Sequence, residues 1–229
     1  MRVSDAADQA GVALRLVGGI AVNLRCSSIR SVSPPRTYRD IDFCGRSAES
    51  KRIEALFENL GYAGNKRFNR LNGGERLIFE DPLRGRHVDV FIDVLRMCHD
   101  LDFRRRLTLI PRTLPVADLL LSKLQIVEMT ERDILDTLAI LGDQPLVNDN
   151  ESGINLRRLA EVCGADWGWW RTITMNLERV STVDGGPPGH DAAARLRKLL
   201  DGVPKSPRWR ARAVIGDRRR WYELPEEVR

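Results

Sequence analysis

A pair of aspartates stands where a strand is expected, and their spacing suits metal-dependent chemistry. Asp40 and Asp42 flank Ile41 in a segment, residues 39–43, that alternates polar and apolar side chains. Residues i and i+2 of a strand point to the same face, so the two carboxylates are expected side by side. Such carboxylates raise each other's pKa unless a cation lies between them, and Mg²⁺ binds one or two carboxylates together with substrate phosphates. A solvated strand face is the alternative explanation.

A third acid follows on another expected strand. Residues 87–93 alternate, with aliphatic side chains on one face and His87, Asp89 and Asp93 among those on the other. A site that holds two metal ions needs carboxylates to bridge them. We favour Asp89 as the third ligand because Asp93 stands at the end of the strand.

A glycine pair lies between an expected apolar strand and an expected helix. Gly18 and Gly19 follow the strand expected at 14–17 and precede the helical turns expected at 20–25. Glycine lets the backbone approach an anion closely, and a helix N-terminus favours negative charge. The pair therefore indicates a phosphate-binding turn, with an ordinary tight turn as the alternative.

Polar residues also recur on two helices predicted further along the chain, at 116–128 and 131–141. Lys123 lies on the first, and Asp133 and Asp136 lie three positions apart on one face of the second. A solvated helix surface is the alternative explanation of these charges.

The remaining periodicity predicts the class of fold. We expect an α+β protein: a mixed β-sheet domain with flanking helices over residues 1–110, then a helical half over 111–229 that contributes Lys123, Asp133 and Asp136 to the site. Further elements are a helix at 47–60, strands at 66–71 and 76–80 joined by a hairpin at Asn72-Gly73-Gly74, a polar linker at 143–153, and helices over 154–203 broken at 185–189.

Composition excludes several other classes of protein. With 229 residues, 42% of them hydrophobic and 30% charged, the chain is not disordered, collagen-like or a coiled-coil rod. No apolar run approaches the roughly 20 residues that cross a bilayer, and the N-terminus has no signal pattern, so we expect a cytoplasmic protein with no membrane partner. We expect the scattered cysteines to be buried, reduced thiols: Cys26, Cys44, Cys98 and Cys163.

The charge pattern permits a nucleic-acid partner. The net charge is +5, and cations alternate with rings in Arg208–Arg212 and Arg218–Tyr222. Further aromatic area comes from Trp167, Trp169 and Trp170. The alternative is that the tryptophans pack in the helical half while arginine stems cover them.

Taken together, the glycine pair, the Asp-x-Asp strand and the distant third aspartate resemble the nucleotidyltransferase superfamily that includes DNA polymerase β and the antibiotic nucleotidyltransferases. Residues 14–142 look most like its AbiEii/MenT branch of toxins. The matching segments are Gly18-Gly19-Ile20-Ala21-Val22, Arg36-Thr37-Tyr38-Arg39-Asp40-Ile41-Asp42, Ser122-Lys123-Leu124 and Arg132-Asp133-Ile134-Leu135-Asp136.

The resemblance implies a role for each matching residue. Asp40, Asp42 and Asp89 would bind two Mg²⁺ ions and act in catalysis, and Lys123, Asp133 and Asp136 would join them. One of the last two would hold Lys123, and one would orient or deprotonate the attacking hydroxyl. The nucleoside triphosphate would be bound by Gly18, Gly19, Arg36, Arg39 and Lys123.

The same resemblance implies a reaction and partners. A nucleoside monophosphate would pass from the triphosphate to a hydroxyl, which in the toxin branch is a tRNA 3′ end, and a cognate antitoxin would be a second partner. A small-molecule nucleotidyltransferase is the alternative; it would keep the carboxylates but would need an acidic acceptor pocket and no basic tail. A non-catalytic module is disfavoured because Asp40, Asp42 and Asp89 are all present.

Overall fold

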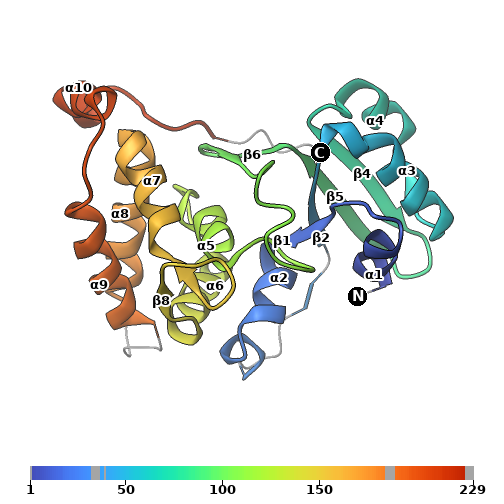
Figure 1. The fold of residues 1–229 in the computed structure, drawn as a ribbon, viewed down its shortest axis with the longest axis horizontal. Helices are drawn as coiled ribbons and strands as arrows, with labels where there is room; N and C mark the ends of the chain where they lie inside the picture. Colours follow the sequence, from blue (N-terminus) through green and yellow to red (C-terminus); the bar gives the residue numbers. More distant parts are fainter. Residues whose placement is uncertain (1, 32–36, 39, 184–188, 225–229) are drawn as a thin grey trace.

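A five-stranded mixed sheet forms one side of the molecule (Figure 1). The computed structural model describes residues 2–31, 37–38, 40–183 and 189–224. Strand order is β1-β2-β5-β4-β3, and only β2 and β5 run parallel. The strands are β1 (Arg15–Val17), β2 (Asp40–Gly45), β3 (Ala63–Gly64), β4 (Arg76–Asp81) and β5 (Arg86–Ile92).

Helices accompany the sheet and then make up most of the second half, so the expected α+β class is confirmed (Figure 1). The first four are α1 (Arg2–Gln9), α2 (Gly18–Arg25), α3 (Ser50–Asn59) and α4 (Lys66–Asn72). The others are α5 (Val116–Leu124), α6 (Glu131–Asp143), α7 (Leu156–Ala165), α8 (Trp167–Val180), α9 (His190–Asp201) and α10 (Pro207–Ile215). Two short sheets pair β6 (Val94–Arg96) with β7 (Asp100–Asp102) and β8 (Leu146–Val147) with β9 (Ile154–Asn155).

The sheet and the helical half share one hydrophobic core. Buried side chains from β2, α3 and β4 belong to the same cluster as those from α5, α8 and α9. The chain after residue 110 also joins the sheet edge, because Leu16 N donates to Arg112 O at 2.8 Å and Leu114 N donates to Leu16 O at 3.0 Å. This continuous core holds α5 and α6 in place against α2. A boundary between two domains at residue 110 stays a prediction.

The strand expected at 66–71 is wrong: this segment is helix α4. Asn65 caps the helix, since its side chain accepts a hydrogen bond from Phe68 N at 3.1 Å. Asn69 is buried and bonds both the N–H and the carbonyl of Ile78, which holds α4 against β4. These side-chain bonds to the backbone outweigh the hairpin signal of Asn72-Gly73-Gly74, and β3 pairs with β4 instead.

The ends of two helices differ from expectation. The helix expected at 116–128 ends at Leu124, and the helix expected at 131–141 extends to Asp143. The second helix begins at Glu131, as expected, where Thr130 and Asp133 form a capping box. All four cysteines are buried and free, as expected. Among the described helices, none is both long and apolar enough to cross a bilayer.

The tryptophans of the second half pack among themselves and under cations. Trp167 lies 5.6 Å from Trp221 and Trp170 lies 5.2 Å from Trp209, measured between ring centroids. The Arg212 guanidinium lies 4.5 Å from the Trp167 ring. The packing explanation of the Arg/Trp-rich tail therefore accounts for these rings.

His99, which stacks on Trp169, makes the stability of the protein depend on pH. Burial lowers the pKa of His99 to about 4, and its Nε2 lies 2.8 Å from Thr172 Oγ1. The folded-state pKa of His99 is below its unfolded value. The contribution of His99 to the free energy of unfolding is therefore complete above about pH 6.5 and declines by about 3 kcal/mol towards pH 4. We expect the unfolding free energy of His99→Gln to fall less than that of the wild type between pH 7 and 4.5, as measured by urea titration. Equal acid destabilisation of both proteins would contradict this assignment.

Candidate active site

The pairing of β2 with β5 brings the acidic residues together. In this parallel register Asp42 is the partner of Asp89, and Asp40 is the partner of His87. Neighbouring strands lie about 4.8 Å apart, and residues at i and i+2 share a face. The four side chains therefore form one polar group on the sheet, at the beginning of both strands.

The Asp42 side chain packs directly against the backbone of Gly18. Val17, the last residue of β1, is the register partner of Asp42. Gly18 follows it with φ +69°, and a Cβ placed there would stand 2.2 Å from Asp42 Oδ2. Only glycine combines this backbone angle with this approach. The Gly-Gly turn and the first acidic strand are therefore parts of one site.

Replacement of Gly18 tests this close approach. We expect Gly18→Ala to displace the Asp42 carboxylate and to reduce any reaction at this site by about 100-fold, because displacements of about 1 Å can cost this much. Gly85→Ala is the matched control, since Gly85 also has positive φ (+59°) but a Cβ there meets nothing within 4 Å. Steady-state rates decide the question: equal losses in both variants would mean that backbone strain alone is responsible.

Asp42 is held at high electrostatic cost. Burial, followed by the charge of Asp89, raises the pKa of Asp42 to about 6; Asp40 adds to this rise, while Lys123 and Arg76 oppose it. The nearby cations thus leave negative charge uncompensated at Asp42. A bound cation would relieve this repulsion.

Asp89 already has two partners. Arg76 Nε donates to Asp89 Oδ1 at 2.8 Å, and His87 Nε2 lies 3.4 Å from Asp89 Oδ2. Arg76 is not among the residues expected at this site from the sequence. The antiparallel pairing of β4 with β5 places Arg76 in the site. Ile78 is the register partner of Asp89, so Arg76, two residues away, lies on the same face.

Asp93, the other candidate for the third acid, serves elsewhere. It follows β5 with φ +61°, and its Oδ1 accepts a hydrogen bond from Ser47 N at 3.1 Å. Asp89, by contrast, lies opposite Asp42 in the sheet. The structure thus brings Asp89 to the acidic group and uses Asp93 in a turn.

Lys123 lies, largely buried, between two aspartates of α6. Its Nζ lies 3.0 Å from Asp133 Oδ1 and 3.0 Å from Asp136 Oδ2. Burial lowers the pKa of Lys123, but Asp136 and Asp133 outweigh burial, so the pKa is raised. Asp136 is fully buried, and Asp133 also bonds Thr130. Both aspartates therefore hold Lys123, and a base role for either stays a prediction that requires this bond to open.

The start of α2 offers backbone donors beside the acidic group. Val17 precedes the helix and provides no side-chain cap for its first N–H groups. Gly19 lies in this first turn. Arg36 and Arg39, expected to bind phosphate, lie outside the described residues.

The donor set partly fits magnesium. Asp40 and Asp42 are hard oxygen donors on one face, Asp40 is exposed, and Asp42 carries uncompensated charge. In the described part of the chain, however, no three His, Cys, Asp or Glu side chains are grouped as a ready-made metal site. The residues therefore suit one ion that takes two carboxylates and completes its shell with phosphate oxygens and water. A second ion at Asp89 would require Asp89 to change partners.

Comparisons with known proteins add a distant likeness of structure. No family model and no curated protein matches the chain. A solution structure of the antibiotic-resistance factor ANT(2″)-Ia is similar with a TM-score of 0.41 and 12% identity, over 95% of this chain and 94% of that one. A crystal structure of ANT(2″)-Ia in complex with adenylyl-2″-tobramycin gives a TM-score of 0.38 and 12% identity, over 87% and 92% of the two chains. Because both TM-scores are below 0.5, function has to be argued from the residues of the site.

Proposed function

We propose that this protein is a magnesium-dependent nucleotidyltransferase, which moves a nucleoside monophosphate from a nucleoside triphosphate to an acceptor hydroxyl. The observation that carries the proposal is the Asp42 carboxylate, which lies against Gly18 at the start of a helix with its pKa raised to about 6. The start of the helix favours an anion, and the Asp42 carboxylate beside it favours a cation. A metal-bound triphosphate has both charges.

The residues have complementary roles in this reaction. Backbone N–H groups at Gly18 and Gly19 bind the phosphates of the triphosphate tail. Asp40 and Asp42 would hold Mg²⁺, which neutralises and aligns the triphosphate when bound. The acceptor oxygen forms a bond to the α-phosphorus, the bond from that phosphorus to the bridging oxygen breaks, and pyrophosphate leaves.

Asp89 is the residue we assign to the acceptor side. Its carboxylate lies beside Asp42 and can accept the hydroxyl proton once the bond to Arg76 or His87 loosens. The second magnesium ion expected from the sequence would bind here under the same condition. Lys123 stabilises the negative charge of the site, since it lowers the pKa of Asp42.

For the acceptor we propose a small molecule with a hydroxyl group. The tryptophans that suggested a nucleic-acid surface contact one another, His99 and cations such as Arg212. The exposed rim of the site carries the acid Asp40, which suits a cationic acceptor better than a polyanion. A tRNA acceptor is the second candidate, favoured by the net charge of +5. A toxin role and an antitoxin partner stay predictions.

Label transfer tests the proposal and separates the acceptors. The protein is incubated with Mg²⁺ and each α-³²P-labelled nucleoside triphosphate, in the presence either of a panel of aminocyclitols or of total tRNA. We expect labelled small-molecule product with the wild type and none with Asp42→Asn. Label on tRNA instead would replace the acceptor and keep the reaction. No product and no pyrophosphate with any nucleotide or acceptor would reject nucleotidyl transfer.

A further inference from the structure

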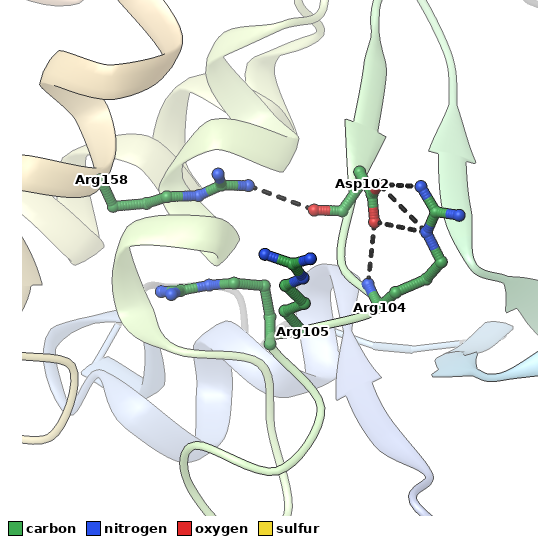
Figure 2. Close-up of a pocket in the computed structure, with 5 residues that line it drawn as sticks. Asp102, Arg104, Arg105 and Arg158 are labelled. Carbon is green, nitrogen blue, oxygen red and sulfur yellow. Dashed lines mark hydrogen bonds and ion pairs between the residues drawn. The ribbon is translucent and has the colours of Figure 1, made fainter.

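A cavity of about 490 Å³ is lined almost entirely by arginine (Figure 2). Its lining residues are Asp102, Arg104, Arg105, Arg106 and Arg158. Asp102 ends β7, the three consecutive arginines follow it, and Arg158 comes from α7. No residue of the candidate active site lines this cavity.

The cavity lies towards the other end of β5 from the active site. Asp89 is the middle residue of β5, whereas β6 and β7 follow the end of that strand. Phe103 N donates to Asp93 O at 3.1 Å, which places the start of the arginine loop at that end. Asp89 and Ile92, the last residue of β5, are three residues apart, about 10 Å along a strand. The cavity is therefore a separate feature of the surface.

Two of its guanidinium groups are held by one buried carboxylate. Asp118 is fully buried and accepts from Arg106 Nε at 2.7 Å and from Arg158 Nε at 2.9 Å. Arg106 Nη2 also donates to Asn150 Oδ1 at 2.6 Å, and Arg158 Nη2 donates to the Asp102 carbonyl at 3.2 Å. These bonds give both groups fixed orientations before any ligand arrives.

Hydrogen-bond donors remain after these bonds are made. Arg104, Arg106 and Arg158 each bond through Nε and Nη2, and their Nη1 groups have no partner among the described residues. Arg105 is exposed and makes no hydrogen bond or ion pair within the described chain. Figure 2 shows its guanidinium in the gap between Arg158 and the Arg104–Asp102 pair.

The charges do not balance. Four arginines face the carboxylates of Asp102 and Asp118, which leaves an excess of two positive charges. A phosphate monoester carries about −1.5 to −2 charges at neutral pH, and guanidinium forks match its oxygens. We propose that this cavity binds a phosphate group. The site is additional to the proposed active site and does not depend on nucleotidyl transfer.

Phosphate could come from a free phosphate compound or from the backbone of a polynucleotide, so the test includes both. Binding of inorganic phosphate is measured by calorimetry, and binding of a labelled 12-nucleotide RNA by fluorescence anisotropy, each without Mg²⁺. The proteins are the wild type, Arg105→Ala and Arg70→Ala. Arg70 is the matched control because it is also an exposed arginine without a partner in the described chain, but it lies on α4.

We expect Arg105→Ala to weaken phosphate binding by about tenfold, as for the loss of a charged hydrogen-bond partner, and Arg70→Ala to leave it unchanged. If RNA binding weakens in parallel, the backbone of a polynucleotide is a source of the phosphate. If only inorganic phosphate is affected, the site takes a free phosphate group. Absence of phosphate binding, or equal losses in both variants, would overturn the proposal. Because no readout is transfer of label, failure here leaves the proposed function standing, and the reverse also holds.

Discussion

Lys123→Met is expected to destabilise the protein by about 3–5 kcal/mol, because it leaves buried carboxylates without their cation. Lys123 Nζ lies 3.0 Å from an oxygen of Asp133 and 3.0 Å from one of Asp136, and Asp136 has no exposed surface. The methionine would fill the space but could not offset the charges. Nucleotidyl transfer should also fall by about 100-fold, since the cation that counters the charge of the site is lost. Chemical denaturation and label transfer measure the two effects.

Two further variants separate the effects of Lys123→Met on stability and on activity. Lys51→Met removes an exposed lysine of α3 and should cost almost no stability. The double variant Lys123→Met/Asp136→Asn removes one of the two carboxylates that Lys123→Met leaves without a counter-charge. It should therefore recover part of the stability but none of the activity. A single variant as stable as Lys51→Met would show that the buried cluster does not depend on Lys123.

The acidic strands could be predicted from sequence because their signal is local. Alternation over residues 39–43 and 87–93 reports a strand with one polar face, whatever it pairs with. Asp40, Asp42 and Asp89 could therefore be selected from spacing alone. The glycine pair was equally visible, although its reason, the approach of Asp42 Oδ2 to Gly18, exists only in three dimensions.

The parts that escaped prediction depend on partners far along the chain. Helix α4 is stabilised by Asn69, whose amide bonds Ile78 on a neighbouring strand. Arg76 is a site residue only because β4 runs antiparallel to β5, a register that no local pattern contains. That both Asp133 and Asp136 hold Lys123 follows from how α5 packs on α6. Sequence periodicity predicts which residues share one face of a strand or helix. The contacts above depend on which of these faces pack against each other, which periodicity does not contain.

Asp42→Asn is expected to abolish transfer and yet to stabilise the protein without metal. The folded-state pKa of Asp42 is raised to about 6, chiefly by burial and then by Asp89, so its ionised form costs stability at pH 7.5. A net shift of about two pKa units, which already includes the attraction to Lys123, corresponds to about 3 kcal/mol. We expect thermal denaturation in EDTA to show a higher Tm for Asp42→Asn than for the wild type.

Magnesium and pH give this prediction its controls. Because the folded state binds the Asp42 proton more tightly than the unfolded state, this residue's contribution to stability increases as pH falls from about 7 to 4, and Asp42→Asn should lack that component. Added Mg²⁺ should raise the Tm of the wild type by mass action and leave the Tm of Asp42→Asn unchanged. An asparagine variant that is less stable in EDTA, with the same response to Mg²⁺ as the wild type, would mean that Asp42 is a structural acid. In that case the uncompensated charge beside Gly18 would no longer support a metal-bound triphosphate.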